Sequence, residues 1–173
     1  MAKYWVGGTG NWSNIAHWAT SSNGAGGSPV PTSTDNVFFD ANSGGGVVTI
    51  DVVASCANLD FTGFTGSVAP SGTININGDL NLGTTITGFA SKTGPTINFV
   101  NNLKSVTIQS NGQNIGNINI ACDGGSVTLL DDLVGLNNNV LTLSAGGFDA
   151  NGKNVTVGGF VTSGSNIKTL TMG

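Results

Sequence analysis

A three-residue pattern of apolar, polar and apolar positions recurs along the chain from residue 48 to its end. The clearest copies are residues 141–143 and 155–157, which are separated by a spacer that contains Asn151-Gly152. Because side chains alternate between the two faces of a strand, each copy predicts a short strand with one buried and one exposed face. The middle residue is Thr, Asn or Asp in all eleven copies, which begin at Val48, Leu59, Ile74, Leu80, Ile97, Val106, Ile118, Val127, Leu141, Val155 and Leu170.

The spacing of these copies favours a stacked architecture. Their mean separation is about 12 residues, so two strands form a unit of about 24 residues, which is within the range of solenoid repeats. The gaps range from 6 to 17 residues, and such irregular spacing is also typical of an antiparallel sandwich. We therefore predict an all-β fold with a β-solenoid (β-helix) over residues 46–173. An antiparallel β-sandwich or jelly roll is the alternative.

The composition agrees with an all-β protein and argues against a nucleic-acid partner and a membrane span. Only 8% of the 173 residues are charged, whereas 38% are apolar and 28 residues are glycine. The five lysines are scattered, so no nucleic-acid partner is expected, and no apolar stretch has the length of a membrane span. Cys56 and Cys122 lie beside predicted strands, and we expect both to be buried free thiols, with a disulfide as the alternative.

Residues 1–45 differ from the repeat that follows them. They contain all three tryptophans, the single His and the single Tyr of the chain. Strands are predicted at residues 4–6 and 36–40, and a loop rich in Gly, Ser, Thr and Pro separates them. We expect this segment to be a small aromatic-rich module that attaches or caps the repeat domain.

The motif that characterises this module begins with GNWSNIAHW at residues 10–18 and continues with Pro31, Asp35, Val37, Phe39, VVTIDV and LDFTG. This succession resembles a module at the start of glycine-rich β-solenoid proteins. Such modules occur in structural proteins of tailed bacteriophages and in large secreted bacterial surface proteins. The bacterial proteins carry an export signal before the module, whereas MAKYWVGGTG contains no apolar run of signal-peptide length, which favours the phage setting.

The resemblance implies a non-enzymatic virion structural protein, made in the host cytoplasm and placed on the virion surface. It would be a head fibre or capsid decoration protein that binds the major capsid protein or another virion protein. We expect Tyr4, Trp5, Trp12 and Trp18 at or just beneath the contact surface; alternatively, the tryptophans form the segment's own core or cap the first coil. A homo-oligomer such as a trimer fits a fibre. The alternatives are a tail fibre, a carbohydrate-binding surface module that contacts glycans, and a bacterial adhesin.

Few residues qualify as catalytic or metal-binding groups, and we predict no enzyme activity, cofactor or metal. Asp131-Asp132 is the only adjacent acidic pair, and neighbours on a strand point to opposite faces. The single His17 is expected to pack beside Trp18. The nearby Asp35, Asp40 and Asp51 offer oxygen ligands for Ca²⁺, but their spacing matches no known calcium loop and fits turn-forming residues equally well.

The last eight residues, 166–173, predict another strand without a capping element. An exposed strand edge promotes association and is normally covered. We therefore expect either that another subunit pairs with this edge or that the natural chain continues beyond Gly173.

Overall fold

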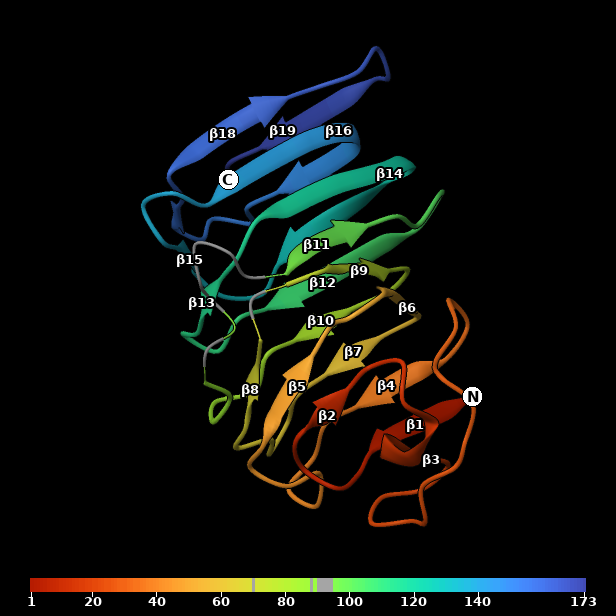
Figure 1. Ribbon diagram of the computed structural model, residues 1–173. Coiled ribbons are helices and arrows are strands. Elements are labelled where there is room, and N and C mark those ends of the chain that lie inside the picture. Colours follow the sequence, from red (N-terminus) through yellow and green to blue (C-terminus); the bar gives the residue numbers. More distant parts are fainter. Residues whose placement is uncertain (70, 88, 90–94) are drawn as a thin grey trace.

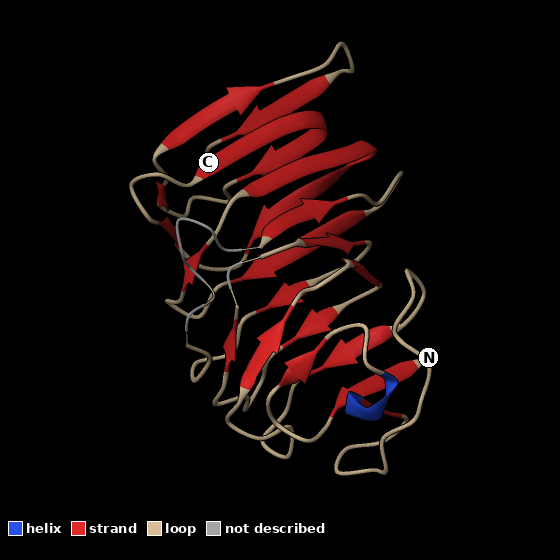
Figure 2. Cartoon of the chain, viewed as in Figure 1, coloured by secondary structure: helices blue, strands red, loops and turns tan. Residues whose placement is uncertain are grey.

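The computed structural model describes residues 1–69, 71–87, 89 and 95–173. These residues form a β-solenoid of about six turns, with a helix content of 2%. Figure 1 shows the coils stacked along one axis from the N-terminus to the C-terminus, and Figure 2 shows that nearly all regular structure is strand. Neighbouring coils pair through parallel strands, which confirms the predicted solenoid and excludes the antiparallel sandwich.

The coils contribute strands to three stacks, which we call faces A, B and C. Face A contains, in order, β1 (Ala2–Trp5), β4 (Asn36–Phe38), β7 (Leu59–Asp60), β10 (Leu80–Asn81), β12 (Ser105–Gln109), the second halves of β14 (Ile118–Leu129) and β16 (Val140–Asp149), and β19 (Lys168–Thr171). Face B contains β6 (Val53–Cys56), β9 (Thr73–Ile76), β11 (Thr96–Phe99), the first halves of β14 and β16, and β18 (Gly159–Thr162).

Face C consists of two three-stranded sheets. One contains β2 (Gly10–Asn11), β5 (Val47–Thr49) and β8 (Ser67–Val68), and the other contains β13 (Asn114–Ile115), β15 (Leu133–Gly135) and β17 (Val155–Thr156). These strands are only two or three residues long. A coil can therefore have three strands rather than the predicted two. The third strand was not predicted because the face C strands are too short to produce a complete alternating pattern in every copy.

Equivalent residues of successive coils lie in register. On face B, Ile74, Ile97 and Ile118 pair in sequence, so these coils are 23 and 21 residues apart, close to the predicted unit. Their side chains are buried, whereas the neighbouring Asn75 and Asn98 lie outside and are joined by an amide hydrogen bond of 3.1 Å. All eleven predicted apolar–polar–apolar copies begin within strands, which confirms the two-residue periodicity.

The interior is one continuous apolar cluster that begins with an aromatic cap at the N-terminal end. Trp5, Trp12 and Trp18 are at most 1% exposed, and the Trp12 and Trp18 ring centroids are 4.8 Å apart. Phe39 continues the aromatic packing toward Phe61 of the next coil, at 4.6 Å. The short strand β3 (Trp18–Ala19) runs antiparallel to β1 and covers its free edge, so this end of the solenoid is closed.

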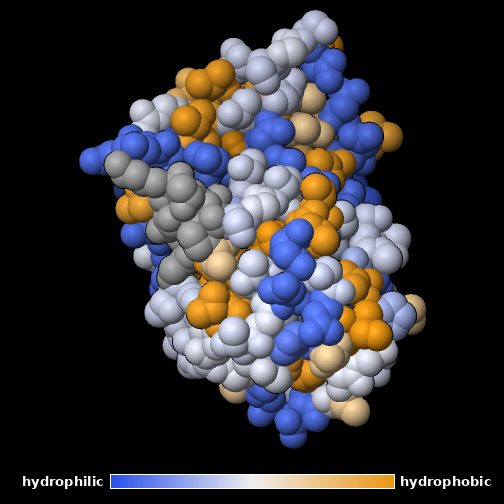
Figure 3. Space-filling model, viewed as in Figure 1, coloured by the Kyte–Doolittle hydropathy of each residue, from blue (hydrophilic) through white to orange (hydrophobic). Residues whose placement is uncertain are grey.

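The C-terminal coil leaves the opposite end of the interior accessible. Phe160 pairs with Leu141 and Leu170 pairs with the buried Phe148, so both occupy inward positions, yet they are 42% and 47% exposed. Figure 3 shows small apolar patches over the visible face, including one at the end where β18 lies. The strand predicted within residues 166–173 is present as β19.

Candidate functional site

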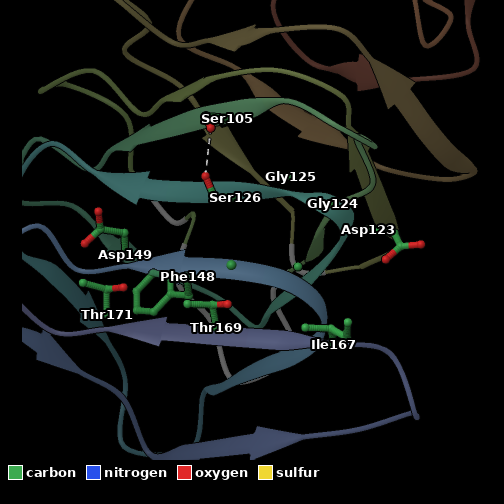
Figure 4. Close-up of a pocket in the computed structure, with 12 residues that line it drawn as sticks. Ser105, Asp123, Gly124, Gly125, Ser126, Phe148, Asp149, Ile167, Thr169 and Thr171 are labelled. Atoms are coloured by element: carbon green, nitrogen blue, oxygen red, sulfur yellow. Dashed lines mark hydrogen bonds between the residues drawn. The ribbon is translucent and has the colours of Figure 1, made fainter.

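A groove lies on face A near the C-terminal coils (Figure 4). It forms because the corner of β16 is shorter than the corners on either side. Residues 122–125 of β14 lie opposite the single residue Gly146, and residues 163–167 lie opposite residues 144–145. The two longer corners therefore project as lips, and the β16 corner lies recessed between them.

Two glycines form the floor of this recess. Gly146 has a φ of +77°, and a Cβ placed on it would lie 1.9 Å from the carbonyl oxygen of Cys122. A Cβ on Gly147 would lie 3.0 Å from the Cβ of Ser126. Glycine is therefore required at residue 146 by both backbone conformation and space, and its neighbour keeps the recess free of side chains.

The groove has a volume of about 520 Å³, within the range of roughly 300–1,000 Å³ that is typical of small-molecule sites. Four hydroxyl side chains, two carboxylates and one exposed isoleucine line it: Ser105, Ser126, Thr169, Thr171, Asp123, Asp149 and Ile167. Figure 4 shows the two carboxylates at opposite ends of the groove. The Ser126 hydroxyl donates a hydrogen bond of 3.0 Å to Ser105, which leaves hydroxyl groups available to both donate to and accept from a ligand.

Asp123 differs from the other aspartates of the chain. Eight of the nine carboxylates accept a hydrogen bond from a backbone N–H and so stabilise turns or join coils: Asp35, Asp40, Asp51, Asp60, Asp79, Asp131, Asp132 and Asp149. Within the described residues, the carboxylate of Asp123 has no hydrogen-bond partner, and the residue is exposed on the lip of the groove. Its acceptor capacity is thus available to a ligand.

The adjacent acidic pair has a structural arrangement. Asp131 accepts hydrogen bonds from the backbone of Ser110 and Asn111 in the preceding coil, whereas Asp132 accepts from the backbone and side chain of Asn154 in the following coil. The bonds from Asn154 hold the pKa of the Asp132 carboxyl below its ordinary value. The pair lies in the connection between β14 and β15 rather than on a strand, and each carboxylate joins a different pair of coils.

The aromatic residues assigned to partner binding lie at two depths. The three tryptophans are buried in the cap, where the indole N–H of Trp18 donates to the carbonyl of Trp12 at 2.7 Å. They therefore lie beneath the surface and form the core that was the alternative interpretation. Tyr4 is half-buried on the outside of face A, and its ring stacks on Phe38 with centroids 5.0 Å apart.

His17 belongs to the same cap. Its ring stacks on Trp5 at 4.6 Å rather than on Trp18, and its Nδ1 lies 2.8 Å from the carbonyl oxygen of Val6. The expected structural role agrees with this geometry, although the aromatic partner differs. The sequence neighbour Trp18 turns away because β3 pairs with β1, which places Trp18 edge-on to Trp5.

The three aspartates considered for calcium are each engaged separately. Asp51 accepts hydrogen bonds from the backbone and hydroxyl of Ser13, and Asp40 accepts from the backbone of Asn42. Burial raises the pKa of Asp35, but hydrogen bonds from Thr32 and the N-terminal ammonium at 3.1 Å outweigh it and lower the pKa to about 2. Across the described residues, no three His, Cys, Asp or Glu side chains come together as a metal site.

Both cysteines are buried free thiols, as predicted. Burial raises the pKa of Cys56 to about 12 and that of Cys122 to about 11. The thiols are therefore protonated at neutral pH, and the nucleophilic thiolate form is suppressed. They act as small core side chains.

The groove was missed by the sequence analysis. Its signal in the sequence is the pair of glycine doublets at residues 124–125 and 146–147, which lie one coil apart. The doublets do mark corners. Their alignment in neighbouring coils, which depends on the strand register, creates the recess.

Comparisons with known proteins add no assignment. No family model matches the chain, and no curated protein and no solved structure matches it. The one helix of the described residues is the single turn η1 (Ile15–His17), and none of them belongs to a helix with the length and apolar character needed to cross a membrane.

Proposed function

We propose that the protein is a non-enzymatic structural component of a tailed-phage virion. It is a head fibre or capsid decoration protein that docks through residues 1–45 and displays a β-rod. The observation that carries this proposal is the location of the residues that resemble the phage module. The first of these residues, including Trp12, Trp18 and Phe39, pack in the aromatic cap at one end of the solenoid, and the later ones continue into β5 and β7 (Figure 1).

The polar groups of the rod support a structural role. Eight of nine aspartates bind backbone N–H groups, and the outer amides form ladders such as that between Asn58 and Asn36, at 3.0 Å. These groups are used to satisfy the backbone and to fix the register of the coils. Such a stack is rigid along its axis because each coil contacts its neighbours through in-register strands.

The cap also presents a small apolar surface for docking. Ile15 is 54% exposed on η1, and the stacked pair of Tyr4 and Phe38 lies on the outside of face A. The three buried tryptophans belong to the same cap as these side chains. Apolar and aromatic anchors on a rigid support contribute most of the energy of protein interfaces. A virion protein that covers this surface is the proposed partner.

Immunogold electron microscopy tests the virion role. Antibody to this chain is applied to particles purified from a lysate of its source. Label over the capsid is expected, whereas label confined to the tail would reassign the protein to a tail fibre. Particles that carry neither label nor peptides of this chain would refute the virion assignment and favour the bacterial adhesin.

A matched pair of variants tests the docking surface. Ile15→Asp on the cap and Ile167→Asp at the opposite end both place a carboxylate at an exposed isoleucine, at 54% and 87% exposure. Co-sedimentation of the purified chain with particles that lack it should be lost for Ile15→Asp and retained for Ile167→Asp. The reverse result would place the contact at the C-terminal coils and contradict docking through the cap.

A further inference from the structure

The groove on face A has features that turn formation alone does not require. If the corners of neighbouring coils had equal lengths, Gly147 would lie in a continuous surface. Instead, the corners at residues 122–125 and 163–167 project on either side of it. The lip at residues 122–125 also carries Asp123, the one aspartate that binds no backbone N–H within the described residues. The recess and a carboxylate that accepts no hydrogen bond from the described residues therefore occur together.

The lining of the groove indicates the chemistry of its ligand. The hydroxyls of Ser126, Thr169 and Thr171 can each donate and accept hydrogen bonds, and the carboxylates only accept. Among the described residues, no lysine lines the groove, and the nearby ammonium group of Lys168 is bonded to the carbonyls of Gly164 and Asn166. An anionic ligand would meet two carboxylates, and no cation among the described lining residues balances them, so the groove disfavours it.

A cation is also a poor match for the groove. The carboxylates of Asp123 and Asp149 lie at opposite ends, and one oxygen of Asp149 already accepts from the backbone of Asn151 at 2.8 Å. A ligand with several hydroxyl groups can donate to both ends at once through charge-assisted hydrogen bonds. The glycine floor and the exposed Ile167 offer flat and apolar contacts for carbon-bound hydrogens.

We propose that this groove is a binding site for a neutral glycan, with hexose units placed over Gly147 between Asp123 and Asp149. The ring hydroxyls donate to the carboxylates and exchange hydrogen bonds with the serine and threonine hydroxyls. Ile167 contacts the apolar side of the sugar. The site lies at the opposite end of the solenoid from the aromatic cap, so a docked protein could still bind a glycan (Figure 1).

The test uses the full ¹⁵N-labelled chain and four hexasaccharides at roughly 1 mM, a concentration that detects weak binding. Three are neutral, built from β-1,4-linked glucose, α-1,4-linked glucose and β-1,4-linked N-acetylglucosamine, and the fourth is anionic oligogalacturonate. At least one neutral glycan should shift the backbone amide signals of Gly146, Gly147 and Thr169. The anionic glycan should not shift them.

Variants connect the binding to the groove. Gly147→Thr fills the recess, and Asp123→Asn removes the free carboxylate; each should weaken binding by roughly tenfold or more. Asp60→Asn makes the same chemical change elsewhere on face A and should leave affinity unchanged. Asp123 makes no internal hydrogen bond within the described residues, so its variant remains informative if Gly147→Thr disturbs folding. The proposal is overturned if no neutral glycan binds, or if Asp123→Asn binds as tightly as the parent.

Discussion

Replacing Gly146 by alanine separates two reasons why a glycine is required at a coil corner. Gly146 and Gly152 have similar backbone conformations, with φ values of +77° and +69°. An added Cβ on Gly152 meets no atom within 4 Å, whereas on Gly146 it would lie 1.9 Å from the Cys122 carbonyl oxygen. Gly152→Ala therefore adds only the cost of a left-handed conformation, which is roughly 1–2 kcal/mol.

Gly146→Ala adds to this cost a steric overlap that the coil cannot relieve in place. The Cβ and the Cys122 oxygen would have to separate by more than 1 Å to reach the 3.0 Å below which Cβ contacts essentially never occur. That shift would disturb the bond from the Gly146 N–H to the Ile167 carbonyl, at 3.1 Å. We expect a loss of roughly 4 kcal/mol or more, a magnitude that indicates a specific structural conflict.

Urea unfolding followed by circular dichroism measures both losses. The parent and the two variants are compared at one protein concentration, and the unfolding midpoints are converted with a common slope. Gly152→Ala is the control for the conformational cost. Equal destabilisation by the two substitutions would show that the close approach to Cys122 does not constrain the corner, and the explanation of the recess would be wrong.

Three further predictions concern the core, the thiols and the cap. Phe148→Ala should lower the free energy of unfolding in urea by roughly 3–5 kcal/mol. Leu170→Ala, at the paired position with 47% exposure, should lower it by about 1 kcal/mol. Equal losses would contradict the accessibility of the interior at the C-terminal end. Cys56 and Cys122 should resist a thiol reagent at pH 8 until the chain is unfolded, because burial raises their pKa values to about 12 and about 11; rapid labelling of the folded protein would contradict this. The lowered pKa of Asp35 stabilises the fold above the ordinary value of 3.8, and this contribution should disappear as the pH falls toward 2; an Asp35→Asn variant with an unchanged acid-unfolding profile would contradict it.

The buried positions could be predicted from the sequence because strand geometry is local. At Ile74 and Ile97, the alternation with polar neighbours identifies the inward side chain without any knowledge of the partner strand. The third strand of each coil was harder to predict. β13 and β17 are each two residues long, which is too short for periodicity to distinguish them from turns.

The candidate site depended on relations between coils. The glycine doublets at residues 124–125 and 146–147 indicate only turns when they are considered in the sequence. Their effect follows from register, since residues 122–125 lie opposite Gly146 alone and project beyond it. Asp123 could not be identified from the sequence for the same reason. It differs from the other eight aspartates only in the backbone N–H groups that lie near the carboxylate, and these depend on the register of the coils.

The sequence by itself determined the all-β class, the inward and outward residues, and the buried state of both thiols. These properties follow from composition and from the alternation of side chains along a strand, which need only near neighbours in the chain. Only the tertiary structure decided the three-faced coil, the depth of the tryptophans and the location of the groove. Each of these depends on which residues, about 21–23 positions apart, pair across the parallel strands. One residue inserted at a corner changes this pairing but leaves the local alternation of apolar and polar residues intact.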